Sequence, residues 1–265
     1  MVGFPLDNRP CAVIYRTLKQ AAIKRRAMQL TDAKVVILGG STGIGFATAK
    51  AASAEGARVT IAGRSPEKLK QAKAALADRV ETAALDVNDE TAVRDFFAAR
   101  DGIDHIFITA GNPAHAPRLE IDTSLLRRAM DTRFMGALYA VKYGAPKMRR
   151  NGSIVFMSGS TSTTPLPGEP VVTASCAAVE AFARALAVDL APLRVNAITP
   201  GYIETPFLDD ILGERKEAIL AAAAARLPAK RIGRVEEAAD GVLFLMKNEY
   251  VTGIALLVDG GYHLV

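Results

Sequence analysis

The sequence has few cysteines and no long uninterrupted apolar run, and each absence excludes a class of protein. Two cysteines, Cys11 and Cys176, make no disulfide framework, which favours a reducing compartment and predicts a cytoplasmic protein. No stretch approaches ~18 uninterrupted apolar residues, so we expect no membrane-spanning helix. The N-terminus has no apolar stretch after a basic start, so we expect no secretory signal. The three histidines show no metal-like spacing, and we expect no metal site.

Outside its first thirty residues, the chain also has no net charge. The formal net charge is +5. Residues 1–30 hold six Lys or Arg residues against Asp7 alone, which accounts for all of it. The basic balance therefore indicates no nucleic-acid surface on the rest of the chain. We expect residues 1–32 to form a basic extension that is disordered or loosely docked. A membrane-surface helix, a nucleic-acid arm and a targeting peptide are the alternatives.

From Lys34 onward, short apolar runs alternate with stretches of helical periodicity. The runs are nearly continuous, as in strands that helices cover on both faces. This alternation predicts one α/β domain over 33–265, a doubly wound parallel sheet (Rossmann fold) in three layers. The expected strands are 34–39, 58–63, 80–87, 105–110, 153–158, 194–199 and 255–259. The expected helices lie near 44–55, 66–77, 90–100, 122–148, 173–190, 205–224 and 236–247.

A glycine-rich loop follows the first expected strand and opens the first expected helix. It reads Leu38-Gly39-Gly40-Ser41-Thr42-Gly43-Ile44-Gly45. Glycine permits a tight turn and lets the backbone approach a pyrophosphate, which then sits on the helix N-terminus. In this context the loop predicts a dinucleotide site, and a plain strand-to-helix turn is the alternative.

The end of the second expected strand predicts which dinucleotide binds. It reads Ala62-Gly63-Arg64-Ser65, without the acidic residue that would bind the ribose 2′-hydroxyl of NAD. The guanidinium of Arg64 matches phosphate geometry, and Ser41 can add a hydroxyl. The sequence therefore predicts NADP(H) rather than NAD(H), with a solvated Arg64 as the alternative.

Further motifs, in the same order, resemble those of the short-chain dehydrogenase/reductase family. Leu85-Asp86-Val87 is similar to its adenine-binding turn, Thr109-Ala110-Gly111 to its Asn-Ala-Gly, and Pro200-Gly201-Tyr202-Ile203-Glu204-Thr205 to the loop that covers the nicotinamide. The resemblance runs from about Ala33 to Val265 and implies a homodimer or homotetramer. With the glycine loop, it implies a cofactor site made by Gly39, Ser41, Thr42, Gly43, Ile44, Arg64, Asp86, Val87, Ala110, Gly111, Pro200, Gly201, Ile203 and Thr205.

The sequence departs from this resemblance at the catalytic positions. The family uses Asn, Ser, Tyr and Lys, and the matching positions here hold Arg133, Gly159, Val172 and Cys176. Val172 has no proton to exchange. Cys176 would ionise at working pH only beside positive charge, and a small buried helix residue is its simpler interpretation. The frame is fixed by neighbours that fit the family pattern Tyr-x-Ala-Ser-Lys-Ala-Ala without a gap: Ala174, Ser175, Ala177 and Ala178.

The remaining polar residues give the candidate catalytic set Arg133, Ser158 and Glu169. A guanidinium at the position of the family's Asn can stabilise an oxyanion or bind a substrate carboxylate. Glu169, just before Val172, is a candidate general acid or base, although pairing with Arg133 would lower its pKa. A structural ion pair between the two is an equal alternative. Ser158 can hydrogen-bond a carbonyl.

Two functions of different classes stay open. The first is an NADP(H)-dependent oxidoreductase with a rebuilt proton relay, acting on a carbonyl, enone or imine-type small molecule. The second is a catalytically inactive NADP(H)-binding protein with a structural or regulatory role. Because the domain itself carries no basic excess, the expected partner is a small molecule and not a nucleic acid.

Overall fold

Seven parallel strands form one sheet in the computed structural model, which describes residues 30–76, 80–110 and 122–265. The strand order is β3-β2-β1-β4-β5-β6-β7, so the direction of winding reverses between β1 and β4. Ligands of such sheets bind at this reversal, beyond the carboxyl ends of the strands. The predicted single-domain Rossmann fold is confirmed. The strands are β1 (Lys34–Leu38), β2 (Arg58–Gly63), β3 (Val80–Ala84), β4 (Ile103–Ile108), β5 (Met148–Met157), β6 (Arg194–Pro200) and β7 (Ala255–Val258).

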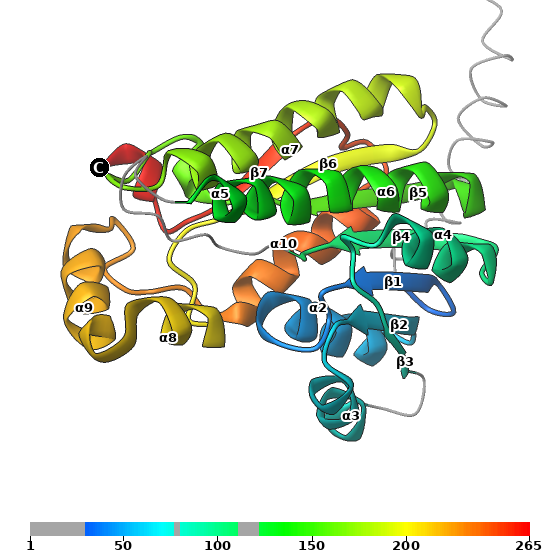
Figure 1. The fold of residues 1–265 in the computed structure, drawn as a ribbon, viewed down its shortest axis with the longest axis horizontal. Coiled ribbons are helices and arrows are strands. Elements are labelled where there is room, and N and C mark those ends of the chain that lie inside the picture. Colours follow the sequence, from blue (N-terminus) through cyan, green and yellow to red (C-terminus); the bar gives the residue numbers. More distant parts are fainter. Residues whose placement is uncertain (1–29, 77–79, 111–121) are drawn as a thin grey trace, which may run out of the picture.

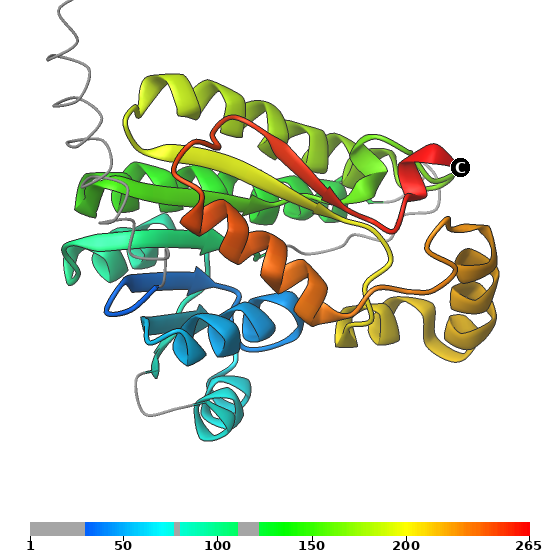
Figure 2. The same ribbon diagram turned by 180° about the vertical axis from the view of Figure 1, so that it is seen from behind.

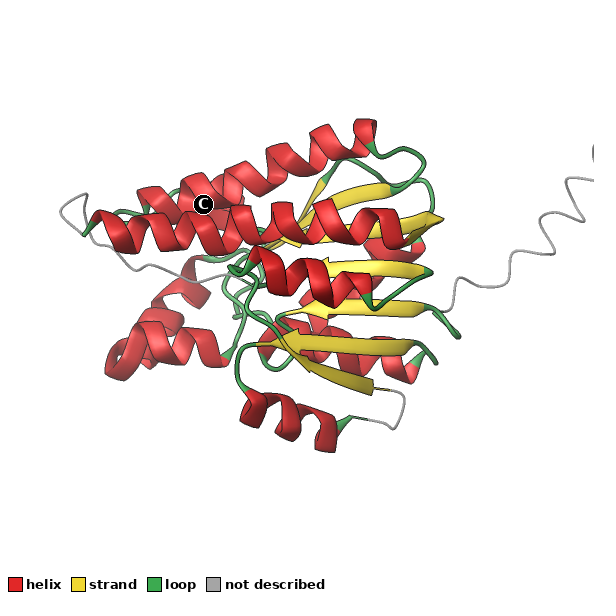
Figure 3. Ribbon diagram, turned by 45° about the vertical axis from the view of Figure 1, so that its right-hand side comes forward, coloured by secondary structure: helices red, strands yellow, loops and turns green. Residues whose placement is uncertain are grey.

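Helices cover both faces of the sheet and give three layers, as Figures 1 and 2 show from opposite sides and Figure 3 shows by secondary structure. Each face has its own apolar core. The central strand β4 feeds both, because Ile106 packs into one core and Phe107 into the other. One face carries α4 (Glu90–Ala98), α6 (Gly136–Gly144) and α7 (Pro170–Asp189), and the other carries α2 (Gly43–Ala54), α3 (Pro66–Ala75) and α10 (Val235–Lys247).

Two stretches predicted as single helices are divided. The first consists of α5 (Thr123–Met130), a π-helical turn (Asp131–Met135) and α6, after which β5 already begins at Met148. The second is split into α8 (Pro206–Leu212) and α9 (Lys216–Arg226) at Gly213, whose φ of 50° cannot continue a right-handed helix. Both α8 and α9 lie beyond the sheet in Figures 1 and 2, beside the carboxyl ends of the strands.

The sheet domain begins earlier than the expected boundary at residue 33. Leu30 is 3% exposed and packs in the core on the α2 side. Its backbone N–H donates to the Glu55 carboxylate over 3.3 Å. Leu30 therefore belongs to the sheet domain. Of the expected extension 1–32, residues 1–29 lie outside the described residues.

Within the described residues, one helix is long and apolar enough to cross a membrane by length and composition alone, namely α7. Core helices of globular proteins satisfy the same criterion. Here α7 lies along β5 and β6, and Val179 and Ala183 pack into the core between helix and sheet. This packing accounts for the apolar residues on the buried side of α7, and 28% of the apolar window is buried.

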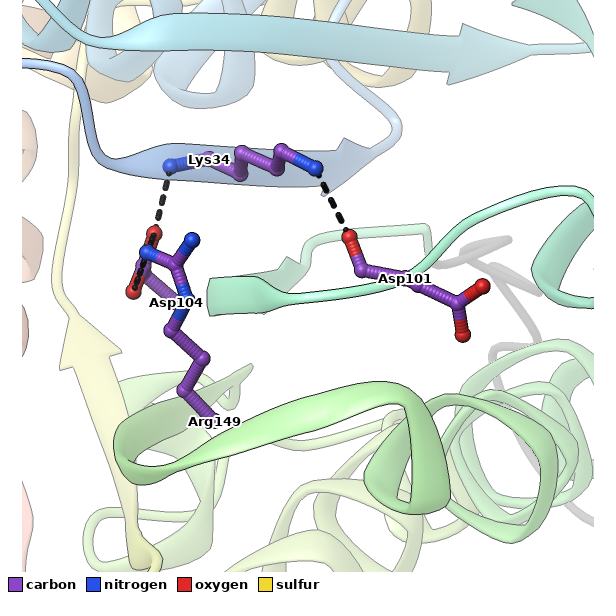
Figure 4. A network of polar contacts seen from close by, with 4 residues as sticks. All are labelled: Lys34, Asp101, Asp104 and Arg149. Atoms are coloured by element: carbon purple, nitrogen blue, oxygen red, sulfur yellow. Dashed lines mark hydrogen bonds and ion pairs between the residues drawn. The ribbon is translucent and has the colours of Figure 1, made fainter.

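A polar network joins three strands at the amino end of the sheet, opposite the carboxyl ends (Figure 4). The backbone N–H of Lys34, on β1, donates to Asp104 over 2.8 Å, and its ammonium donates to the Asp101 carbonyl over 2.9 Å. Arg149, on β5, donates to the same Asp104 carboxylate over 3.0 Å. The network thus connects β1, β4 and β5 at this end.

Candidate active site

One cavity of about 770 Å³ lies at the carboxyl ends of the strands. It runs from the turn after β2 to the residues of α8 and α9. Gly111 lies outside the described residues. Every other residue predicted for the site lines this cavity: Gly39, Ser41, Thr42, Gly43, Ile44, Arg64, Asp86, Val87, Ala110, Arg133, Ser158, Glu169, Pro200, Gly201, Ile203 and Thr205.

The glycine loop forms one half of the cavity, which we call the nucleotide half, and it is built from backbone. Gly39 has φ +96°, and a Cβ there would lie 2.9 Å from the backbone nitrogen of Ala110. A Cβ at Gly45 would collide with the carbonyl oxygen of Gly39. Thr42 makes no side-chain cap, and the first turn of α2 holds no acidic residue. The helix N-terminus is therefore suited to a phosphate group, so the residues present fit a dinucleotide.

A second cation joins Arg64 at the end of the nucleotide half. Lys68, in the first turn of α3, lines the cavity with Arg64. Ser65 caps that helix, since its hydroxyl accepts from the Lys68 N–H over 3.3 Å. The Ser41 hydroxyl lies 3.5 Å from where a Cβ of Gly63 would stand, which places it beside the same turn. Sequence reasoning missed Lys68, although the Ser-Pro start of the helix was a usable signal.

The wall that Val172 and Cys176 contribute is small and largely apolar. Both side chains line the cavity, one helical turn apart on α7. Cys176 is 1% exposed and its sulfur accepts from the Thr161 hydroxyl over 3.8 Å. A Cβ at Gly159 would lie 3.3 Å from that sulfur. The thiol thus fills a tight space, in agreement with its simpler interpretation as a small buried residue.

A Tyr-x-x-x-Lys spacing does occur elsewhere, at Tyr143 and Lys147, but it does not reach this cavity. The Tyr143 hydroxyl donates to Glu90 over 2.7 Å, and Lys147 donates to Asp101 over 3.1 Å. Neither residue lines the cavity. The same spacing at Tyr15 lies outside the described residues. Val172 and Cys176 therefore line the cavity, whereas Tyr143 and Lys147 do not.

Arg133 enters the cavity from the π-helical turn between α5 and α6. Such turns are rare and occur frequently at functional sites. The guanidinium is only partly buried, and it donates to the Met157 carbonyl over a long 3.5 Å. A charge-assisted hydrogen bond to a ligand would be shorter, near 2.8 Å. The geometry leaves Arg133 able to bind an anionic or carbonyl group in the cavity.

Ser158 is engaged by a buried carboxylate that sequence reasoning missed. Its hydroxyl, on a residue 3% exposed, lies 2.6 Å from Glu180 Oε1 and 3.3 Å from the Cys176 carbonyl. The same Glu180 oxygen accepts from Ser162 over 2.6 Å and from Thr199 over 3.2 Å. Glu180, on α7, thus joins the segment after β5 to the end of β6, beside the cavity. Its signal was the one carboxylate in the mostly apolar stretch 177–187 that follows Cys176.

Two tyrosines and Glu169 line the other half of the cavity, which we call the substrate half. Glu169 is the residue before α7. The Tyr202 and Tyr262 rings are 5.5 Å apart at 87° and both line the cavity. Burial raises the pKa of each phenol, and the charge of Glu169 raises the pKa of both further. Sequence reasoning quoted Tyr202 in its loop motif and gave it no role, because no short motif links it to Tyr262.

Comparison with known proteins gives matches along nearly the whole described domain. A family model described as Enoyl-(Acyl carrier protein) reductase matches residues 39–263. Short-chain dehydrogenase/reductase malC of Malbranchea aurantiaca is 37% identical over 257 residues, covering 89% of this chain and 97% of that protein. Short-chain dehydrogenase/reductase ucsE of Acremonium sp is 32% identical over 257 residues, with the same coverage of both chains.

Solved structures agree with these matches. The structure of MalC Reductase/Diels-Alderase from Malbranchea aurantiaca superposes with a TM-score of 0.85 and 34% identity, covering 91% of this chain and 100% of that one. A small-chain dehydrogenase in complex with NADPH superposes with a TM-score of 0.75 and 31% identity, covering 88% and 100%. The Malbranchea aurantiaca protein thus matches this chain both in sequence and in structure.

Proposed function

The chain is a member of the short-chain dehydrogenase/reductase family, and we propose that it is an NADP(H)-dependent oxidoreductase with a non-standard active site. Its substrate is a small molecule with a polarised carbonyl, enone or imine group. One observation carries the proposal. One cavity joins the backbone-built nucleotide half to a wall that holds Val172 and Cys176, beside Arg133 and Glu169. The sequence resemblance aligns Val172 and Cys176 with the family's Tyr and Lys.

The preference for NADP(H) rests on the charges at the end of the nucleotide half. Arg64 and Lys68 line the cavity there, and the Ser41 hydroxyl lies beside the same turn. A 2′-phosphate would neutralise both cations, whereas a ribose hydroxyl would leave them without an anionic partner. The NADPH complex of a relative supports this preference.

The residues of the substrate half define what chemistry fits. NADPH supplies a hydride from C4 of its nicotinamide when it is bound. Arg133 binds an anionic or carbonyl group of the substrate and stabilises negative charge on its oxygen. Val172 and Cys176 shape the wall without exchanging a proton with the substrate. Ser158 and Glu180 hold the floor of the cavity in place. A substrate that is already polarised needs little acid assistance, and this arrangement suits it.

The name of one relative favours reduction as the direction of reaction. The Malbranchea aurantiaca protein is described as a reductase/Diels-Alderase. We extend only the reductase part to this chain, because hydride transfer needs chiefly that donor and acceptor carbons be held together. The cavity residues that would do so here are the Pro200-Gly201 loop and Val172.

The experiment starts from the full chain and measures two quantities. The dissociation constants of NADPH and NADH are compared by fluorescence, and we expect NADPH to bind more tightly. Absorbance at the NADPH band is then followed with a panel of ketones, enones and cyclic imines. We expect turnover with at least one class, and loss of that turnover in Arg133→Ala with NADPH affinity unchanged.

The second candidate function is a non-catalytic NADP(H)-binding protein, and the same positions motivate it. Val172 and Cys176 remove the proton donor and its ammonium, while the nucleotide half keeps its fit. NADPH binding without turnover on any member of the panel would favour this candidate. Turnover that survives unchanged in Arg133→Ala would reject the site assignment and leave the oxidoreductase activity in place.

A further inference from the structure

Tyr202 and Tyr262 bring two phenols to a cavity whose α7 wall has none. Tyr202 is half-buried and stands between Gly201 and Ile203, in the loop expected to cover the nicotinamide. Tyr262 is 8% exposed and belongs to the C-terminal turn. Their rings meet edge to face, 5.5 Å apart, an arrangement that aromatic pairs prefer. Tyr262 thus packs against the Tyr202 ring.

Tyr202 lines the same cavity as the start of α7, but it comes from a different element. Glu169 precedes α7 directly, and Val172 lies in the first turn of that helix. Both residues line the cavity together with Tyr202 and Tyr262. Tyr202 thus faces the cavity that Val172 faces, from the loop after β6.

We propose that Tyr202 is a catalytic residue whose hydroxyl donates to the substrate oxygen and replaces the phenol that Val172 cannot supply. The inference rests on the proposed function and narrows it to substrates with a C=O group, ketones or enals. Hydride adds to the carbonyl carbon and the π-electron pair moves to oxygen. The oxygen takes the phenol proton, and the Tyr202 phenolate regains a proton from solvent. Substrate gains two electrons and two hydrogens, and NADPH becomes NADP⁺.

The environment of Tyr202 keeps it in the form that donates. Burial raises its pKa above the ordinary value of 10, the Glu169 charge adds to this rise, and the Arg226 charge opposes it without reversing it, so the phenol is protonated throughout the neutral range. An alkoxide is a far stronger base than a phenolate, so proton transfer in this direction is downhill. The family's tyrosine differs, since an adjacent ammonium lowers its pKa.

The test uses a carbonyl probe whose spectrum reports hydrogen bonding without turnover. The full chain is loaded with NADP⁺, which cannot donate a hydride, and mixed with 4-(dimethylamino)cinnamaldehyde. The absorption band of this enal moves to longer wavelength when its carbonyl oxygen accepts a strong hydrogen bond. We expect the shift in wild type, its loss in Tyr202→Phe, and its retention in Tyr262→Phe, the matched control that removes the neighbouring hydroxyl.

Each other outcome overturns the inference. A shift that persists in Tyr202→Phe, a wild type without a shift, or a shift lost equally in both variants would each remove Tyr202 as the donor. NADPH affinity is measured in all three proteins and is expected to be unchanged, which shows that the variants are folded. The result also separates the two proposals. A spectral shift that depends on Tyr202, in a protein that turns over no substrate, would refute the proposed oxidoreductase activity. It would still support Tyr202 as the hydrogen-bond donor to the carbonyl oxygen.

Kinetics provide the second readout. With the best ketone or enal of the panel, we expect Tyr202→Phe to lower kcat at least about 100-fold, the usual contribution of a positioned acid. The decline of wild-type kcat at high pH, as the phenol ionises, should disappear in the variant. A kcat within about threefold of wild type would contradict the inference.

Discussion

The two halves of the cavity share one sheet, but different parts of the chain hold them. The nucleotide half is made of backbone, where Gly39 and Gly45 leave no room for a Cβ. The substrate half is made of side chains from separate elements, such as Arg133 from the π-helical turn, Glu169 from the residue before α7 and Tyr202 from the loop after β6. A backbone-built site tolerates few changes, whereas a side-chain-built site can change its chemistry one residue at a time. Cofactor binding and catalysis can therefore diverge separately in this fold.

The largest expected effect comes from removing a side chain of the substrate half. This change also tests whether cofactor binding in the nucleotide half is independent of the substrate half. Arg133→Ala should lower kcat/KM by about 100- to 1,000-fold, because one oxyanion-stabilising group contributes that much. NADPH affinity should stay within about twofold. Isothermal titration with NADPH and steady-state kinetics with the best panel substrate measure the two effects. Arg133→Lys, which keeps the charge but loses the planar fork, is the matched control and should recover part of the loss. A parallel loss of NADPH affinity would show that the two halves are one unit.

The difference between the halves also explains which parts of the site could be predicted from the sequence. The glycine loop and the Arg64 turn are short local motifs, and the residues predicted from them line one cavity. The role of Glu180 was not predicted, because the hydroxyl groups that donate to it belong to Ser158, Ser162 and Thr199, which only the fold brings together. The stretch 205–224 was predicted as one helix because periodicity does not reveal the positive φ of Gly213. Local rules thus find backbone-built sites, and long-range packing decides the rest.

A pH experiment tests the sheet that carries both halves. His105 on β4 and Ser153 on β5 are buried, and His105 Nδ1 lies 2.9 Å from Ser153 Oγ. Burial lowers the pKa of His105 from 6.5 to about 4. Between these values the unfolded chain binds the proton and the folded chain does not, so stability falls as pH drops from 6.5 to 4. The loss approaches about 3 kcal/mol at the acid end.

The matched variant for this experiment is His105→Gln, which keeps a hydrogen-bonding side chain and cannot titrate. Urea unfolding of both proteins at several pH values gives the difference in slope. We expect the variant to lose the part of the pH dependence that lies between 6.5 and 4. Equal slopes in the two proteins would show that His105 is protonated as easily in the fold as in water.

Cofactor choice tests whether the nucleotide half is as independent as its construction indicates. Arg64→Asp should weaken NADPH binding by about 100-fold, roughly 2.7 kcal/mol, because a carboxylate then faces the 2′-phosphate. NADH affinity should rise or stay the same. Lys68→Ala is the milder control and should cost about tenfold, since Arg64 remains. The ratio of the two dissociation constants in each protein is the measurement, and an unchanged ratio in Arg64→Asp would place the 2′-phosphate elsewhere.

The smallest effect is expected at the amino end of the sheet, where the network of Figure 4 joins β1, β4 and β5. Arg149 on β5 and Asp104 on β4 form an ion pair there, but the Arg149 side chain is 59% exposed. Exposed pairs contribute less than about 1 kcal/mol, and salt screens them. Arg149→Ala should therefore lower the free energy of unfolding by under about 1 kcal/mol at low salt and by less in 1 M NaCl. Because the cavity lies at the opposite end of the strands, NADPH affinity and kcat should not change. A change in either would mean that the amino end of the sheet is coupled to the cavity through β4 and β5, and that the separate construction of the two halves does not isolate them from the rest of the sheet.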